Sequence, residues 1–389
     1  MKKLISILGS TGSVGLSTLN IVDKNKNILK PYIFSANKNY KLICKQIKKY
    51  KPIIFIVKDK YTYIKVLKKF KNNKVVLIND FKFLKIKIKS DITVSAIPGI
   101  AGLIPTEKMI KHSKKILLAN KESIICGWNL IKNKAKKSKT ELIPIDSEHY
   151  SILKLLEHEE ISRVEKIYLT ASGGPFLNYS LKDLKNIKPH QALKHPKWKM
   201  GKKITIDSST LMNKILELIE AQKLFDLEIN KLDILIHPNS LVHAILELKN
   251  GLYKFIYHDT SMKIPLANAI FDGDVNIKKI YNKVNFLNNK NLIFKKVNKK
   301  IFPAIILKDK ISQFPSTPII INAANEFLVD EFLKKRIAYI DIIKIIMSIL
   351  RDKNYKKYAI KKAFSVNQIL LIDLWARKTA KDKVIKKYE

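Results

Sequence analysis

The stretch Leu4-Ile5-Ser6-Ile7-Leu8-Gly9-Ser10-Thr11-Gly12-Ser13-Val14-Gly15 decides the fold of this chain. Its apolar first half predicts a buried strand, and the G-x-x-G-x-x-G spacing predicts a tight turn that leads into a helix. Glycine is hard to replace where the backbone needs a positive φ or passes close to another group. The chain holds only eleven glycines, so three of them in seven residues indicate a constrained turn.

Short apolar runs alternate with segments of helical spacing from this stretch to about residue 146. Tyr40–Tyr50 and Tyr61–Lys71 carry apolar residues three and four positions apart, which is typical of helices between strands. This alternation predicts an α/β fold that begins with a Rossmann-like, doubly wound parallel sheet. The strands are expected at Leu4–Leu8, Pro31–Ser35, Ile53–Val57, Val75–Ile78, Ile92–Ile97, Ile116–Ala119 and Leu142–Ile145.

The pattern changes after Asp146. A helix is expected at about 209–225, and Asn250-Gly251 between two apolar runs predicts a β-hairpin. Helical spacing returns near 319–334 and 340–350, where Thr317-Pro318 is expected as N-cap and first helical residue. We therefore expect a nucleotide-binding domain at 1–146, a central α+β catalytic domain at 147–275 with a flexible loop at 194–203, a linker at 276–300 and a C-terminal helical domain at 301–389.

The composition excludes several classes of protein. The chain has 389 residues, of which 46% are hydrophobic, and this excludes a disordered chain. Its two cysteines, Cys44 and Cys126, exclude a disulfide scaffold and a cysteine-built zinc cluster. Its apolar runs are shorter than a membrane span needs, and the apolar start ends at once in Gly9. We expect a soluble cytoplasmic protein with no membrane partner.

The formal net charge of +42 raises the alternative of a nucleic-acid-binding protein. However, only four of the 75 basic residues are arginine, the residue that base and phosphate recognition favours. The basic residues are also spread along the whole chain rather than gathered in one segment. We interpret the charge mainly as drift towards AT-rich codons, and we expect no nucleic-acid partner.

The glycine turn indicates a dinucleotide. A pyrophosphate fits at the N-terminus of a helix, where unpaired N–H groups and the helix dipole favour an anion. The second strand ends in Ser35-Ala36-Asn37-Lys38-Asn39, without the carboxylate that usually binds the ribose of NAD. This favours NADP, whose 2′-phosphate suits Lys38. The alternative is a tight turn that binds nothing.

Asp146-Ser147-Glu148 follows the last predicted parallel strand. In an extended segment, residues i and i+2 point to the same side, so the two carboxylates are expected to converge. Paired carboxylates need a cation or a shared proton, and oxygen ligands favour Mg²⁺ or Mn²⁺. The alternative is a helix N-cap, Asp146 or Ser147, beside a surface acid.

Three further segments carry candidate residues for a phosphorylated substrate. Asp207–Glu217 predicts a helix that opens with a hydroxyl-rich N-cap and presents Asn213, Lys214 and Glu217, although an ordinary amphipathic helix would look similar. Ser172-Gly173-Gly174 predicts a turn with donors for a phosphate. His195–Gly201, with Trp198 in a polar loop, predicts a lid; the alternative is a tryptophan packed in a local cluster. Lys121 follows a parallel strand, at the edge where such sheets bind ligands.

These segments, in this order, resemble the 1-deoxy-D-xylulose 5-phosphate reductoisomerase family. The resemblance covers nearly the whole chain. The matching stretches are Ile7–Gly15, Ala101–Thr106, Leu118–Ser123, Pro144–His149, Ser172–Phe176, His195–Ile204, Asp207–Glu220, Leu235–His243 and Asn322–Glu326.

The resemblance implies the roles of individual residues. It implies NADPH contacts by Thr11, Gly12, Ser13, Val14, Asn37, Lys38, Asn39, Asn120, Glu122 and Gly201. It implies a divalent-metal site formed by Asp146, Glu148 and Glu217, which with Lys121 and His195 are the expected catalytic residues. It implies substrate contacts by Lys121, Ser147, Glu148, Ser172, His195, Trp198, Ser208, Asn213, Lys214 and Glu217, with Met200 on the same loop as Trp198.

The resemblance also implies the reaction. 1-Deoxy-D-xylulose 5-phosphate would rearrange to 2-C-methylerythritose 4-phosphate, and NADPH would reduce this aldehyde to 2-C-methyl-D-erythritol 4-phosphate, an isoprenoid precursor. The chain departs from the family's usual pattern at Asn37 and Ile215, where glycine is usual, and at Lys263, where arginine is common. The family habitually forms homodimers. A metal-dependent sugar-phosphate isomerase without a redox step is the alternative enzyme.

Overall fold

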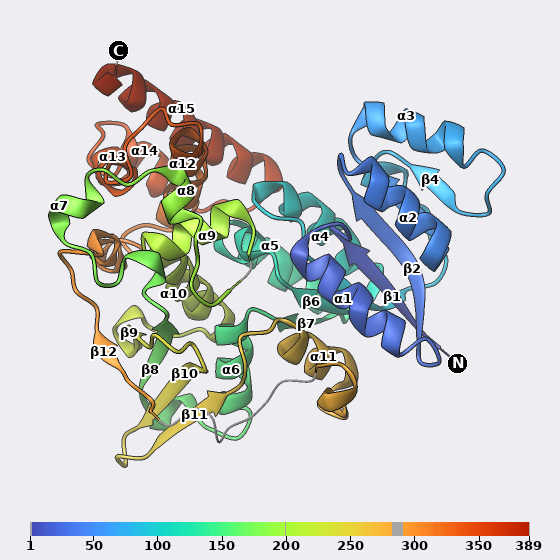
Figure 1. Ribbon diagram of the computed structural model, residues 1–389, viewed down its shortest axis with the longest axis horizontal. Coiled ribbons are helices and arrows are strands. Elements are labelled where there is room, and N and C mark those ends of the chain that lie inside the picture. The colour runs from blue at the N-terminus through green and yellow to red at the C-terminus, as the bar shows by residue number, and fades with distance from the viewer. Residues whose placement is uncertain (1, 199, 282–290, 389) are drawn as a thin grey trace. The chain divides into compact units, whose positions relative to one another are not determined.

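The computed structural model describes residues 2–198, 200–281 and 291–388 (Figure 1). The chain forms two compact units. The first comprises Met1–Ser123, Asn129–Asp146 and Ser261–Lys283, and the second comprises Ile124–Trp128, Ser147–Thr260 and Val284–Glu389. The segment that returns to the first unit covers the end of the predicted catalytic domain and the start of the predicted linker at 276–300. Residues 282–290 of that linker lie outside the described residues. The predicted domain scheme stays a prediction.

A seven-stranded parallel sheet forms the centre of the first unit, in the order β4-β3-β2-β1-β5-β6-β7. Each strand expected from the sequence is present, and only the ends are shifted. The strand order reverses between β1 and β5, as in a doubly wound sheet. The strands are β1 (Lys3–Leu8), β2 (Leu29–Ala36), β3 (Ile54–Val57), β4 (Val76–Ile78), β5 (Ser90–Ser95), β6 (Ser113–Leu118) and β7 (Glu141–Pro144).

Helices connect these strands and cover the sheet. Right-handed crossovers that run outward in opposite directions from β1 and β5 place α1–α3 and α4 on opposite faces. The two helices expected between strands are confirmed as α2 and α3. The bounds are α1 (Ser13–Lys24), α2 (Tyr40–Tyr50), α3 (Lys60–Lys69), α4 (Leu103–Ile110), α5 (Lys121–Ser138) and α11 (Lys263–Phe271), which packs beside α1.

The glycine turn lies at the reversal point of the sheet. Gly9 has a φ of 83°, and a Cβ on it would lie 2.6 Å from the Ala96 carbonyl oxygen, beyond the end of β5. A Cβ on Gly15, in the first turn of α1, would lie 2.4 Å from the Gly9 oxygen and 2.7 Å from Ser10 Cα. Glycine at these two positions therefore lets β1, the turn and α1 pack in direct contact.

A mixed five-stranded sheet forms the core of the second unit, in the order β11-β10-β8-β9-β12. The predicted hairpin is confirmed as β10 and β11, which pair antiparallel. β8 and β9 pair parallel, and α6 (Ser147–Leu156) packs against β10. The strands are β8 (Val164–Ala171), β9 (Leu232–Ile236), β10 (Val242–Leu248), β11 (Tyr253–Tyr257) and β12 (Lys295–Lys296).

The helix expected at about 209–225 is confirmed as α10 (Met212–Phe225), and a separate helix, α9 (Lys202–Ser209), precedes it. Leu211 separates them with a left-handed φ of 64°. The predicted hydroxyl-rich N-cap is therefore wrong: Ser209 Oγ donates to the Ile206 carbonyl at 2.7 Å, so these hydroxyls end α9 instead. Serine and threonine bond readily to carbonyls three or four residues back, which explains this use of the same residues.

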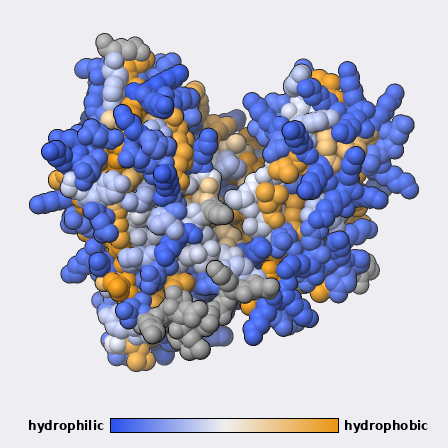
Figure 2. All heavy atoms as spheres, viewed as in Figure 1, coloured by the Kyte–Doolittle hydropathy of each residue, from blue (hydrophilic) through white to orange (hydrophobic). Residues whose placement is uncertain are grey.

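The end of the chain is helical, as expected. α12 packs against α13 and α15, and Ser316 is its N-cap, so Thr317 is already the first helical residue. Within the described part of the chain, no helix is both long and apolar enough to span a membrane. Figure 2 shows hydrophilic side chains over much of the visible face of both units. The remaining helices are α7 (Leu181–Leu184), α8 (Pro189–Ala192), α12 (Thr317–Leu333), α13 (Asp341–Ile349), α14 (Tyr355–Ala359) and α15 (Val366–Tyr388).

We predict that Gly15→Ala destabilises the chain, because the new methyl group meets backbone atoms that cannot rotate away. Overpacking of this kind costs about 1–3 kcal/mol, and the midpoint of thermal unfolding should fall by several degrees. Gly201→Ala is the matched control, since a Cβ there has no neighbour within 4 Å and the φ is −65°. Equal midpoints for the two variants would contradict the close packing of the turn.

Candidate active site

Three carboxylates converge on one point. Asp146 follows β7, Glu148 lies in the first turn of α6 and Glu217 lies on α10. Each offers one oxygen, and these oxygens lie within 4.8 Å of one another. The predicted convergence of Asp146 and Glu148 is present, but its expected cause is wrong, because Glu148 is helical rather than extended. Three converging carboxylates are a suitable ligand set for Mg²⁺ or Mn²⁺.

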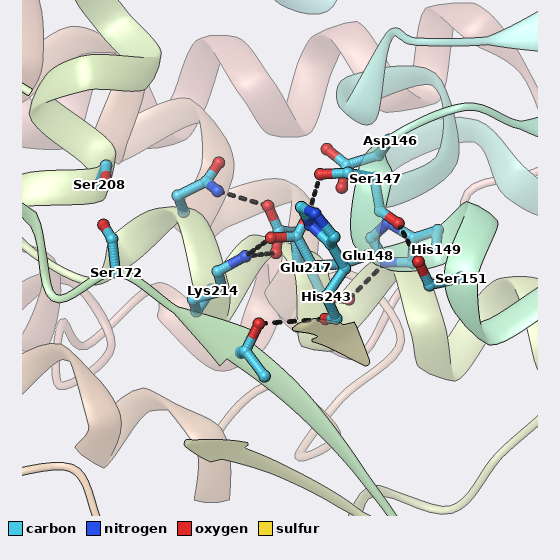
Figure 3. A network of polar contacts seen from close by, with 12 residues as sticks. Asp146, Ser147, Glu148, His149, Ser151, Ser172, Ser208, Lys214, Glu217 and His243 are labelled. Carbon is cyan, nitrogen blue, oxygen red and sulfur yellow. Dashed lines mark hydrogen bonds and ion pairs between the residues drawn. The ribbon is translucent and has the colours of Figure 1, made fainter. Parts of the chain in front are cut away.

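Lys214 supplies the positive charge next to two of these acids (Figure 3). Its Nζ lies 2.5 Å from Glu148 Oε1 and 2.5 Å from Glu217 Oε2. Asn213 Nδ2 donates to the other oxygen of Glu217, and Ser147 Oγ donates to Glu148 Oε2 at 2.6 Å. Because Glu217 is buried, these donors offset the cost of removing its charge from water.

Lys121 begins α5, directly after β6. Its Nζ forms an ion pair with Asp146 Oδ2 at 2.5 Å, and the lysine is buried. Asn120 caps the same helix, since its Oδ1 accepts from the Ser123 N–H at 2.9 Å. Asn120 Nδ2 donates to the Ile97 carbonyl and to Glu122 Oε2. The segment after β6 thus holds the ammonium group of Lys121 and the hydrogen-bonded side chains of Asn120 and Glu122 in fixed positions.

Two hydroxyls and one imidazole form a second polar cluster in the second unit. His195 Nε2 lies 3.2 Å from Ser172 Oγ and 3.1 Å from Ser208 Oγ. His195 Nδ1 accepts from the backbone N–H groups of Lys197 and Trp198, at 3.1 and 2.9 Å. In the neutral ring the proton is therefore on Nε2, which faces the two serines. This cluster offers hydrogen-bond donors to a phosphate.

Burial and the charge of Lys214 lower the pKa of His195 from 6.5 to about 4. The ring is therefore neutral at pH 7. A neutral ring still donates through Nε2, and it avoids placing a second cation near Lys214.

The predicted lid residue Trp198 packs on His243. Its ring meets His243 edge-on, with centroids 6.1 Å apart. His243 stacks on His258 at 3.8 Å, and both histidines are buried. The predicted alternative of a local cluster therefore describes this conformation, and closure of the loop stays a prediction. Lys199, within the predicted flexible loop, lies outside the described residues.

The predicted cofactor residues of the first unit follow three strands of the parallel sheet: those of the glycine turn follow β1, Asn37 to Asn39 follow β2, and Asn120 and Glu122 follow β6. Gly12, the N-cap of α1, is exposed and has no side-chain cap, so the helix leaves N–H groups available to an anion. Asn37 and Lys38 are exposed, and Asn39 caps α2 by accepting from the Leu42 N–H at 3.2 Å. Gly201 is the N-cap of α9 in the second unit, and its contact with NADPH stays a prediction.

One supporting group was missed in the sequence. Asp207 is buried on α9, where its Oδ1 accepts from Asn325 Nδ2 of α12 at 2.8 Å and its Oδ2 lies 3.2 Å from Lys203 Nζ. Tyr339 OH donates to the Ser209 carbonyl at 2.6 Å. These contacts fix the end of α9, next to Ser208. The stretch Asn322–Glu326 was the available signal, but a role for Asn325 could not be inferred without its partner.

Comparison with known proteins agrees with this geometry. A family model for 1-deoxy-D-xylulose 5-phosphate reductoisomerase matches residues 5–127, and models for its C-terminal domains match 142–225 and 259–379. A protein of that name from Pelagibacter ubique (strain HTCC1062) is 45% identical over 375 residues, covering 95% of this chain and 96% of the relative. The chain belongs to the 1-deoxy-D-xylulose 5-phosphate reductoisomerase family.

Other members of the reductoisomerase family match along their full length. The protein from Clostridium novyi (strain NT) is 38% identical and covers 98% of this chain and 99% of the relative. A crystal structure of DOX-P reductoisomerase with NADPH, fosmidomycin and magnesium matches with a TM-score of 0.91 at 31% identity, covering all of both chains. The enzyme from Zymomonas mobilis with NADPH matches at 0.88 and 30%, covering 99% of both chains.

The three departures from the usual reductoisomerase pattern lie on different elements of the fold. Asn37 is exposed after β2, and Lys263 begins α11. Ile215 is fully buried on α10, between Lys214 and Glu217, which form an ion pair. The residues of the carboxylate cluster are all present.

We predict that His195 titrates near pH 4 in the free protein, as followed by the chemical shifts of its ring in NMR spectra. Between pH 6.5 and 4 the unfolded chain binds this proton and the folded chain does not. The contribution of His195 to stability is therefore complete above pH 6.5 and is lost as the pH falls towards 4. His195→Gln assigns the signal, and a midpoint near 6.5 would contradict the burial of the ring.

Proposed function

We propose that this chain converts 1-deoxy-D-xylulose 5-phosphate into 2-C-methyl-D-erythritol 4-phosphate, with NADPH and Mg²⁺ or Mn²⁺. The observation that carries this function is the convergence of Asp146, Glu148 and Glu217 in a chain of this family that also has an uncapped dinucleotide turn. A divalent cation on these carboxylates supplies a Lewis acid for the ketone and an adjacent hydroxyl of the substrate. NADPH supplies the hydride for the reduction.

The residues of the second unit bind and orient the phosphorylated sugar. Ser172, Ser208 and the Nε2–H of His195 donate to phosphate oxygens, which the distances of 3.2 and 3.1 Å from His195 Nε2 to the two hydroxyls support. Asn213 and Lys214 hold Glu217 in place and present N–H groups beside it. Trp198 covers the substrate and excludes water when its loop closes.

Lys121 is the further catalytic residue of this proposal. It is buried at the end of β6, and its ion pair with Asp146 fixes the ammonium group beside a metal ligand. A fixed ammonium stabilises negative charge that develops on an oxygen of the substrate. Ser147 orients Glu148 through its hydrogen bond and is the last of the proposed substrate-binding residues.

The glycine turn distinguishes this reaction from that of a simple sugar-phosphate isomerase. An isomerase without a redox step has no need of a dinucleotide. This chain has the close-packed turn at Gly9 and Gly15, at the reversal point of the sheet, where such folds bind a dinucleotide. The absence of a carboxylate after β2 and the exposed Lys38 favour NADPH over NADH.

We predict that Glu217→Gln abolishes metal-dependent turnover, since the neutral amide is a weaker ligand for Mg²⁺ and no longer pairs with Lys214. Activity should fall at least a hundredfold, as measured by NADPH absorbance with 1-deoxy-D-xylulose 5-phosphate. The affinity for NADPH, measured by fluorescence, should change little because Glu217 lies on α10, outside the dinucleotide turn. Near-normal activity would refute the metal assignment.

We propose that the chain forms a homodimer through β11. This strand ends the sheet of the second unit, so one side of its backbone has no strand partner among the described residues. Tyr253 and Phe255, which share one face of the strand, are 57% and 47% exposed. Two copies of β11 can pair about a two-fold axis, which closes the assembly.

We predict that Phe255→Lys weakens this dimer, because it places a like charge beside its own copy at the interface. Light scattering after size exclusion should give the mass of two chains for the parent and of one for the variant at micromolar concentration. Leu371→Lys on α15 is the matched control, since Leu371 is also exposed, at 63%. A parent of monomer mass, or a variant that stays dimeric, would contradict this interface.

A cytoplasmic location completes the proposal. Cys44 and Cys126 are both buried and unbridged, which fits a reducing compartment.

A further inference from the structure

Gln46 is a buried polar residue that the proposed mechanism does not use. It lies on α2, three positions after Ile43 and directly before Ile47, on the buried face of the helix. Its side chain is packed inside the first unit and is only 3% exposed. Burying an amide is unfavourable unless its hydrogen bonds are satisfied. The partner that satisfies Gln46 is therefore informative.

Both ends of the Gln46 amide bond to Ser10, the second residue of the glycine turn. Gln46 Nε2 donates to the Ser10 carbonyl at 2.9 Å, and Gln46 Oε1 accepts from Ser10 Oγ at 2.6 Å. The carbonyl can only accept, so the orientation of the amide is determined. Thirty-six positions separate the two residues in the sequence, and the double contact ties α2 to the turn.

Ser10 connects Gln46 to the residues of the glycine turn that are expected to face the cofactor. Ser10 is fully buried, so its side chain points inward, whereas Gly12 and Ser13 are exposed. The Ser10 N–H donates to the Ser35 carbonyl at 2.8 Å, which fixes the turn from β2. Gln46 is the contact that fixes the Ser10 carbonyl, and with it the plane of the peptide bond to Thr11.

The same helix carries the other end of the predicted cofactor site. Asn39 caps α2, and Asn37 and Lys38 precede it. A shift of α2 would therefore move the residues expected at the 2′-phosphate and, through Gln46, the turn expected at the pyrophosphate. The position of α2 therefore determines the distance between the glycine turn and the segment expected at the 2′-phosphate.

We propose that Gln46 is a positioning residue for NADPH, which acts by holding the Ser10 carbonyl and so keeps the N–H groups of the glycine turn aimed at the pyrophosphate. This inference rests on the proposed use of NADPH. The competing explanation is that the amide only stabilises the packing of α2, alongside Ile43 and Ile47. The two explanations differ in whether loss of the amide changes binding of the cofactor or only the stability of the fold.

The test compares Gln46→Met with Thr140→Val. Methionine has nearly the length of glutamine and lacks the hydrogen bonds, so the Ser10 carbonyl loses a donor and the turn relaxes towards water. Thr140 also makes buried hydrogen bonds in the first unit, with its Oγ1 2.7 Å from the Ile110 carbonyl and 3.0 Å from that of Ser113. Its loss lowers stability without touching the glycine turn.

The measurement is NADPH affinity by fluorescence titration of the full chain without metal or substrate, together with the thermal midpoint. We expect Gln46→Met to raise the Kd about tenfold, from the loss of two hydrogen bonds, and Thr140→Val to leave the Kd unchanged. In steady state, the KM for NADPH should rise while the KM for the sugar phosphate stays the same. An unchanged Kd in a folded Gln46→Met protein would overturn the proposal.

Ser10→Ala provides a second route to the same answer if Gln46→Met does not fold. It removes the hydroxyl contacts with Gln46 Oε1 and with the Ser35 carbonyl, 3.2 Å away, and keeps the Ser10 carbonyl that accepts from Gln46, so we expect a rise in Kd of about threefold. An unchanged Kd for this variant would count against the role of Gln46. If the parent chain itself does not bind NADPH, the proposed function fails, and that result is distinct from equal binding by parent and variants.

Discussion

Mutual repulsion between carboxylates is the constraint on which the catalytic region depends. Asp146, Glu148 and Glu217 place their oxygens within 4.8 Å of one another, and such a group is stable only where cations are close. Lys214 and Lys121 meet part of this need with ion pairs of 2.5 Å. The negative charge that the lysines do not compensate attracts the divalent cation of the proposed reaction. The two lysines keep the ligands in position when no cation is bound.

The surrounding structure holds these charged groups in fixed places. α10 presents Asn213, Lys214 and Glu217 together, and it starts at the left-handed residue Leu211, which sets its direction after α9. α9 is held in turn by the contact between Asp207 and Asn325 of α12. The C-terminal helices therefore contribute to the site although they supply none of the proposed ligands. In the first unit, α2 holds the glycine turn in a comparable way.

Much of the fold could be predicted because apolar runs and glycines are local signals. The seven strands of the first sheet and the hairpin at Asn250-Gly251 follow from such signals. The break between α9 and α10 could not, because Ser208 to Thr210 suit either end of a helix. The return of Ser261–Lys283 to the first unit depends on contacts such as that of Lys115 Nζ with the Ala269 carbonyl, 154 positions away. The contact of Gln46 with Ser10 was hidden for the same reason.

The net charge of +42 has little bearing on this chemistry, since the lysines that matter are a few buried ones such as Lys121 and Lys214. The most direct test of the central claim is the absorbance of NADPH when the purified chain is given a limiting amount of 1-deoxy-D-xylulose 5-phosphate. We predict oxidation of one NADPH per sugar phosphate with Mg²⁺ or Mn²⁺ present, and none after chelation of the metal. Consumption of the sugar phosphate without loss of NADPH, or turnover independent of metal, would contradict the account.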